Sequence, residues 1–125
     1  MICGVHTMFY SSRADELRMF IRDKLKFPFH NVGRGWLIFD MPEADLGVHP
    51  TEAEHSPPNG THNISFYCDD IEKTVAELKS RGVEFVDEIQ NRGYGLVTNF
   101  KMPGDMEMQL YQPLYTKKPR IVVGK

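Results

Sequence analysis

Hydrophobic and polar positions at the start of the chain first suit a strand and then a helix. Aromatic and β-branched residues dominate residues 5–10, which predicts a strand. A helix is predicted to begin at Ser12 and to end at Phe27-Pro28. Its buried stripe falls at helical spacing and comprises Leu17, Phe20, Ile21 and Leu25. Residues 35–40 and 45–49 are predicted as two further strands, joined by a turn at Met41-Pro42.

The second part of the chain follows the same order of elements. Residues 63–68 predict a strand, and Asp70 is well placed to cap a helix that buries Ile71, Val75 and Leu78. Gly82 is the predicted helix stop. Strands are then predicted at residues 83–86, 95–100 and 106–111. Residues 50–61 are polar and contain prolines, which predicts a linker, and residues 114–125 are expected to form an edge segment or a loose end.

The two parts also match residue by residue. A shift of 57 positions sets residues 6–10 over residues 63–67, so that Phe9 matches Phe66 and Tyr10 matches Tyr67. Chance similarity between two amphipathic segments is the simpler alternative, but several matches occur in the same order. An internal repeat of one strand-helix-strand-strand-strand unit is therefore predicted. The predicted modules cover residues 5–49 and 62–113 of a single domain spanning residues 1–125.

Composition narrows the possible partners. The chain has 125 residues, with 41% hydrophobic and 26% charged residues, which is an ordinary globular balance. A formal net charge of −2 gives no reason to expect nucleic acid as a partner. No apolar run approaches the ~18 residues of a membrane span, so no membrane partner is expected. Cys3 and Cys68 form no disulfide framework, which favours a reducing cytoplasm.

Three stretches resemble the vicinal oxygen chelate superfamily of glyoxalases, bleomycin-resistance proteins and dioxygenases. The stretch from His6 to Phe27 is similar to the first module of these proteins, in which a strand-borne histidine precedes a phenylalanine at the spacing of His6 and Phe20. Residues 64–85 resemble the second module, and residues 102–113 resemble its final turn and strand. The resemblance implies an α+β fold in which two tandem βαβββ modules form a curved eight-stranded mixed sheet around a cavity. The helices would lie on its convex side.

Strand alternation predicts which side chains face that cavity. The cavity-facing positions expected to bind a ligand are Tyr10, Asn63, Ser65 and Gln109, with Trp36 as an aromatic wall. Glu107, Tyr67 and Tyr111 are the candidates for catalysis, since carboxyl and phenol groups assist proton transfer.

The resemblance also implies four metal-ligand positions. The residues at these positions give evidence both for and against a bound metal. His6 fits the first, but Asn63 and Gln109 occupy two others, and neutral amides bind transition metals weakly. An offset site of His6, His49 and Glu107 would hold one divalent ion such as zinc, nickel, manganese or iron. The alternative, in which the histidines bind substrate or backbone without metal, is favoured by the depleted ligand set.

Two functions therefore stay open. The first is a glyoxalase-like or bleomycin-resistance-like protein that binds a small organic molecule in the cavity. In its enzymatic version, this protein would be a metal-dependent lyase, isomerase or dioxygenase. The second is a metal-free protein that sequesters a drug or metabolite. The resemblance implies a homodimer in both cases, and it does not identify the ligand.

Overall fold

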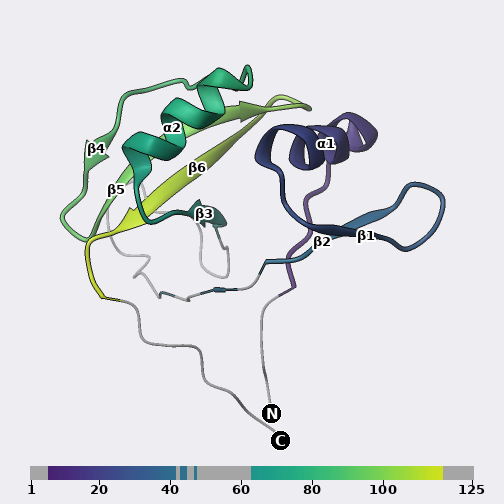
Figure 1. The fold of residues 1–125 in the computed structure, drawn as a ribbon, viewed down its shortest axis with the longest axis horizontal. Coiled ribbons are helices and arrows are strands. Elements are labelled where there is room, and N and C mark those ends of the chain that lie inside the picture. Colours follow the sequence, from purple (N-terminus) through teal and green to yellow (C-terminus); the bar gives the residue numbers. More distant parts are fainter. Residues whose placement is uncertain (1–5, 42, 45–46, 48–62, 117–125) are drawn as a thin grey trace, which may run out of the picture.

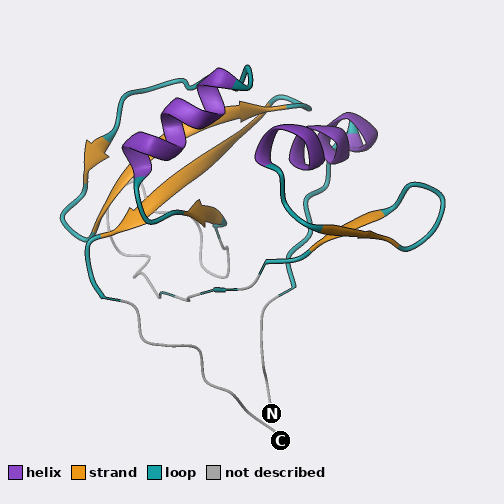
Figure 2. Ribbon diagram, viewed as in Figure 1, coloured by secondary structure: helices purple, strands orange, loops and turns teal. Residues whose placement is uncertain are grey.

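The computed structural model describes residues 6–41, 43–44, 47 and 63–116. Their elements are, in order, α1 (Ala14–Phe20), the π-helical turn η1 (Ile21–Leu25), β1 (Phe29–Asn31), β2 (Leu37–Phe39), β3 (Ser65–Tyr67), α2 (Ile71–Ser80), β4 (Gln90–Asn91), β5 (Gly95–Met102) and β6 (Met106–Pro113). Figure 2 shows these helices and strands along the chain. The α+β class is confirmed.

The strands form two separate sheets. Strands β1 and β2 make an antiparallel hairpin, and the second sheet has the order β3-β6-β5-β4. Strand β3 runs parallel to β6, whereas β5 is antiparallel to both of its neighbours. Figure 1 shows the hairpin extending away from the four-stranded sheet. The expected eight-stranded sheet is not confirmed, because the described residues form six strands in two sheets.

The second helix forms as the sequence predicts. Asp70 is its N-cap, and its side chain accepts a hydrogen bond of 3.1 Å from the backbone N–H of Lys73. Ile71 and Leu78 are buried on its inner face. Gly82 adopts φ +86°, a left-handed conformation that glycine tolerates better than other residues, and the helix has ended before it.

Two predictions for the first half are wrong. Among residues 6–10 there is no strand, because they make no sheet pairing in the described part of the chain. The first helix begins at Ala14 with Arg13 at its N-cap, and no side chain caps it. A strand at Phe29–Asn31 was not expected; it follows Pro28 directly and pairs with β2. The predicted strand at residues 45–49 lies outside the described residues apart from Gly47.

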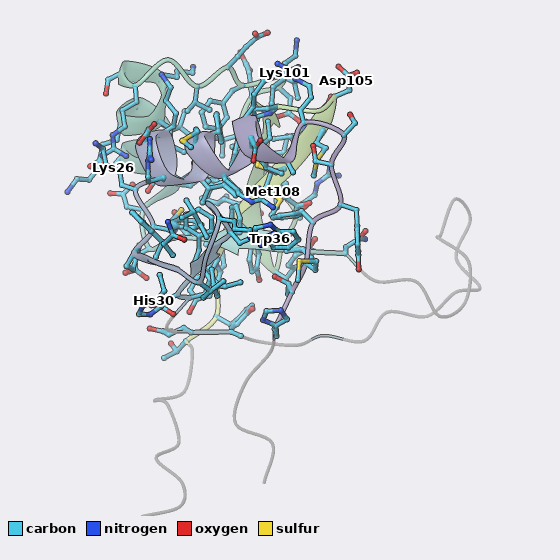
Figure 3. All side chains as sticks on the ribbon, turned by 90° about the vertical axis from the view of Figure 1, so that its right-hand side faces the viewer. Lys26, His30, Trp36, Lys101, Asp105 and Met108 are labelled. Atoms are coloured by element: carbon cyan, nitrogen blue, oxygen red, sulfur yellow. The ribbon has the colours of Figure 1, made fainter. Side chains whose placement is uncertain are left out.

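The core lies between the helices and one face of the four-stranded sheet. Its buried residues come mainly from α1, η1, α2, β5 and β6 and include Leu17, Ile21, Ile71, Phe100 and Leu110. Phe20 and Phe100 stack with ring centroids 6.4 Å apart, which ties α1 to β5. Figure 3 shows Met108 among the packed side chains, with Lys26, Lys101 and Asp105 at the margin. Both helices therefore cover the same face of this sheet.

Two pairs of residues at the repeat distance contact each other. The rings of Phe9 and Phe66 meet edge to face at 6.3 Å. Lys24 Nζ donates to the backbone carbonyl of Arg81 at 2.6 Å, and Arg81 Nη1 donates to the carbonyl of Lys24 at 2.9 Å. These contacts hold the two parts of the chain against each other.

Candidate functional site

The face of the four-stranded sheet that points away from the helices carries a continuous group of polar and aromatic side chains. Ser65 lies opposite Gln109 and Tyr67 opposite Tyr111 across β3 and β6. Across β5 and β6, Asn99 lies opposite Gln109. Paired residues point to the same side of a sheet, and Met108 and Leu110 of β6 point into the core. We call this side the open face; it comprises Ser65, Tyr67, Asn99, Glu107, Gln109 and Tyr111.

Tyrosine rings cluster at one end of the open face. The Tyr111 ring lies directly over Gly95, where a Cβ atom would come within 2.1 Å of its Cε1 atom. Its centroid is 5.9 Å from that of Tyr94 and 6.4 Å from that of Tyr115. The Tyr111 hydroxyl donates to the Tyr115 hydroxyl at 2.9 Å. The absence of a side chain at Gly95 therefore leaves room for the Tyr111 ring.

A carboxylate from the first half reaches the same end of the sheet. The Tyr67 hydroxyl donates to Glu43 Oε2 at 2.5 Å. Glu43, Tyr67, Cys68, Asp69, Pro113 and Tyr115 line a pocket of about 180 Å³ at the carboxyl ends of β3 and β6. We call this the strand-end pocket. It adjoins the open face through Tyr67.

The fold brings together five of the predicted site residues and separates others. Those that share the open face are Ser65, Tyr67, Glu107, Gln109 and Tyr111. Tyr10 is 90% exposed and belongs to no strand. Trp36 adjoins the hairpin and lies 4.7 Å from the guanidinium of Arg18 on α1. Asn63 and His6 are exposed outside the strands, and His49 lies outside the described residues.

The donors on the open face do not by themselves suit a divalent metal. In the described part of the chain, no group of three or more histidine, cysteine, aspartate or glutamate side chains lies together. Gln109 and Asn99 offer neutral amides beside the carboxylate of Glu107. Of the three predicted metal ligands, Glu107 lies on the open face, His6 lies outside the strands, and His49 lies outside the described residues.

Sequence reasoning missed two residues of this site. Glu43 comes from the turn after β2, where no local pattern indicates a position beside β3. Tyr115 lies in the segment that was expected to be an edge or a loose end, yet Leu114 donates a backbone hydrogen bond to Tyr94 at 3.0 Å. The spacing of four residues between Tyr111 and Tyr115 was the signal available in the sequence.

The edge of β5 beside the open face is held by one carboxylate. Asp87 accepts hydrogen bonds from the Thr98 hydroxyl, the Asn99 N–H and the Asn99 side-chain amide at 2.8 to 2.9 Å. Desolvation, the largest single contribution, acts to raise the pKa of Asp87, but these bonds together lower the pKa below its ordinary value. Asn99 is thereby fixed next to Gln109.

Cys68 differs from a reactive thiol. It is half-buried against the core, and desolvation raises the pKa of its thiol, with the charge of Asp69 acting in the same direction. A raised pKa leaves little thiolate at neutral pH. The thiol lines the wall of the strand-end pocket.

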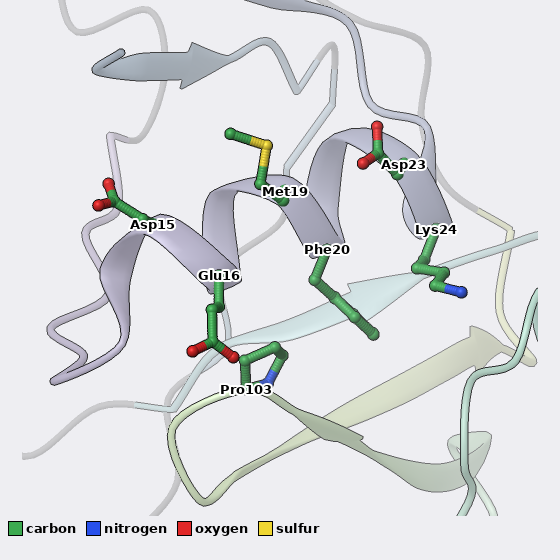
Figure 4. Close-up of a pocket in the computed structure, with 7 residues that line it drawn as sticks. All are labelled: Asp15, Glu16, Met19, Phe20, Asp23, Lys24 and Pro103. Atoms are coloured by element: carbon green, nitrogen blue, oxygen red, sulfur yellow. The ribbon is translucent and has the colours of Figure 1, made fainter. Parts of the chain in front are cut away.

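A larger cleft, of about 390 Å³, lies along α1 and η1 on the helical side of the molecule. Figure 4 shows Glu16 pointing toward Pro103 of the β5–β6 turn, with Phe20 one helical turn further along. Its acidic residues are already paired along the helix, Asp15 with Arg18, Glu16 with Arg13 and Asp23 with Arg22. The cleft contains none of the open-face residues, so its size alone does not make it the functional site.

A family model covers most of the chain. The model of the Glyoxalase/Bleomycin resistance protein/Dioxygenase superfamily matches residues 5–108. The chain belongs to this superfamily. A comparison with curated proteins finds no match. None of the described helices has the length and apolar character needed to cross a bilayer.

Solved structures of the superfamily share the fold at low sequence identity. TnmS3, an antibiotic-binding protein from Streptomyces sp. CB03234, is 22% identical with a TM-score of 0.61, over 90% of this chain and 99% of that one. A glyoxalase/bleomycin resistance protein/dioxygenase from Nocardioides is 17% identical with a TM-score of 0.55, over 90% and 84%. Lactoylglutathione lyase from Agrobacterium tumefaciens is 14% identical with a TM-score of 0.55, over 85% and 90%. At these identities the likeness concerns the fold.

Proposed function

We propose that this superfamily member binds a small organic molecule on the open face without needing a metal ion. The observation that carries the proposal is the group of aromatic and amide side chains displayed together on one sheet face. Tyr111 and Tyr94 offer ring surfaces, while Gln109 and Asn99 offer donors and acceptors beside them. Pockets for small molecules combine apolar walls with a few fixed polar groups in this way.

Rigid support favours binding at this place. The opposite side of β5 and β6 is buried in the core through Phe100, Met108 and Leu110. The Asn99 side chain donates a hydrogen bond to Asp87, and the Tyr111 ring packs against Gly95. Side chains that are fixed before a ligand arrives lose little entropy when it binds. The antibiotic-binding neighbour agrees with such a role.

Leucine substitutions on the open face and on the helical side test the proposal. Screening small aromatic and polar compounds by ligand-observed NMR is expected to find binders whose signal is lost in Gln109→Leu. Glu72→Leu is the control, because Glu72 is an exposed residue of α2, which covers the opposite face of the sheet. Binding lost equally in both variants, or in neither, would overturn the assignment to the open face.

A second candidate is a metal-assisted lyase, isomerase or dioxygenase that uses His6, His49 and Glu107, with Tyr67 or Tyr111 assisting proton transfer. The position of Glu107 favours it. This carboxylate is exposed on the open face, and Lys101, which lies opposite, pairs instead with Glu84 at 3.1 Å. Elemental analysis of untagged protein decides between the candidates. About one equivalent of metal, lost in both His6→Ala and His49→Ala, would replace the metal-free proposal.

We also propose that two copies of the chain pair through their first halves, and that the tandem modules complete an eight-stranded sheet in that pair. The hairpin supports this, since Val32 and Trp36 are 64% and 56% exposed and large exposed apolar patches mark interaction sites. Sedimentation velocity is expected to give a dimer, and Val32→Ser with Trp36→Ser is expected to shift it toward monomer. A monomeric parent protein would refute this pairing.

A further inference from the structure

We infer that the strand-end pocket binds the positively charged head of an organic cation, such as an ammonium or quaternary ammonium group. This inference rests on the proposed function and names the chemical class of its ligand. The pocket of about 180 Å³ joins two acidic residues, Glu43 and Asp69, to two tyrosine rings, Tyr67 and Tyr115. Cations are attracted both to carboxylates and to the faces of aromatic rings.

The two carboxylates come from segments far apart in the sequence. Glu43 follows β2, and Asp69 lies between β3 and the N-cap of α2. Glu43 is oriented by the hydroxyl of Tyr67. A carboxylate has about four lone-pair positions, so this bond leaves Glu43 able to accept from a ligand as well. Among the described residues that line the pocket there is no lysine or arginine to neutralise these charges.

The nearby helix end does not turn the pocket into an anion site. The backbone N–H of Ile71 donates to Gln112 Oε1 at 2.9 Å, and that of Lys73 donates to the Asp70 side chain. Helix N-termini attract anions through N–H groups of this kind. Because side chains already accept from these two N–H groups, the groups are not available to bind an anion. The negative charge of Asp69 contributes to the raised pKa of the Cys68 thiol.

The aromatic part of the pocket continues onto the open face. Tyr115 is hydrogen-bonded to Tyr111, whose ring contacts the ring of Tyr94 in a tilted arrangement. A molecule with a flat body and a cationic head would place the body on Tyr111 and the head between Glu43 and Asp69. The open face and the strand-end pocket would then bind one ligand.

A charged probe and its uncharged isostere test the inference directly. Choline and dimethylbutanol have nearly the same shape, and only choline carries a charge. In NMR titrations of the full chain, we expect choline to shift the amide signals of Cys68 and Asp69 and to bind roughly tenfold more tightly than dimethylbutanol. Equal affinities, or no binding of choline, would overturn the inference.

Four variants locate the binding site. Glu43→Gln and Asp69→Asn are each expected to weaken choline binding several-fold and to leave dimethylbutanol unchanged. Tyr115→Leu is expected to weaken choline binding as well, since it removes a ring wall. Glu88→Gln is the matched control, because this exposed glutamate lies outside the pocket. Choline affinity that is the same in all four variants would also overturn the inference.

The outcomes separate this inference from the proposed function. A ligand that is lost in Gln109→Leu, in a protein that does not bind choline, overturns only the organic-cation pocket. Failure of every compound to depend on Gln109 overturns the proposed function. Choline binding that depends on Glu43 and Asp69 supports the pocket in either case.

Discussion

The two halves of the chain, which are predicted to repeat one sequence plan, are packed differently. In the second half, α2 lies on a sheet made by its own strands and buries Ile71 and Leu78 against it. In the first half, α1 and η1 bury Leu17 and Ile21 in that same core, while the hairpin β1–β2 extends away. A repeat in sequence therefore does not ensure two equal cores. The helix of the first half packs on the sheet of the second.

The exposed apolar side chains of the first half show the consequence of this unequal packing. Its exposed large apolar residues include Phe29, Val32, Trp36 and Met41 around the hairpin. An isolated two-stranded hairpin is marginally stable in water, and unpaired edges invite further pairing. The second half instead displays polar and aromatic groups on a supported face. This difference is the basis for proposing assembly through the first half and ligand binding on the second.

The largest expected effect compares two phenylalanines. Phe100 is fully buried between Phe20 and Phe85, whereas Phe29 of the hairpin is 44% exposed. Phe100→Ala is expected to lower the free energy of unfolding by about 3–5 kcal/mol because it leaves a cavity in the core. Phe29→Ala is expected to cost less than about 1 kcal/mol in the monomer. Urea denaturation at low protein concentration measures both, and similar losses would contradict the unequal packing.

The next comparison concerns two aspartates. Asp87→Ala removes a partner of the Thr98 hydroxyl, which is 1% exposed, so about 1–3 kcal/mol of stability should be lost. Asp40 pairs with His30 Nε2 at 2.7 Å on the surface of the hairpin. Asp40→Ala should cost no more than about 1 kcal/mol, as exposed ion pairs do. Thermal unfolding of both variants checks the order, and a larger loss for Asp40→Ala would reverse the comparison.

Acid should act on Asp87 in a defined direction. The pKa of Asp87 is lowered in the folded protein, so the folded state binds its proton less readily than the unfolded chain does. Ionised Asp87 contributes to the free energy of unfolding above the unfolded pKa of about 3.9. This contribution is lost as the pH falls through the lower pKa of Asp87 in the folded protein. Asp87→Asn should therefore lose less stability than the parent between about pH 5 and pH 2. Urea denaturation at each pH measures this, and a free energy of unfolding that falls in parallel for the two proteins would contradict the prediction.

Sequence reasoning succeeded where local signals and tertiary packing agree. Asp70, the apolar stripe of α2 and Gly82 gave the second helix, and the alternation of Met108 and Leu110 with Gln109 and Tyr111 gave the faces of β6. It failed at residues 6–10, because β propensity produces a strand only when a partner edge is available. The β1–β2 pairing and the position of Glu43 beside Tyr67 depend on contacts that no local pattern records.

The smallest expected effect tests the junction between the halves. Lys24 and Arg81 each donate to the backbone carbonyl of the other, so the ends of η1 and α2 are joined by two reciprocal hydrogen bonds. Lys24→Met and Arg81→Met keep much of each apolar stem and remove one donor each. Each should lower stability by roughly 0.5–1.5 kcal/mol, with similar values for the two. Hydrogen exchange should show the loss in both η1 and the last turn of α2. A loss confined to the mutated helix would mean that the halves fold as separate units, because a shared junction must transmit the damage across it.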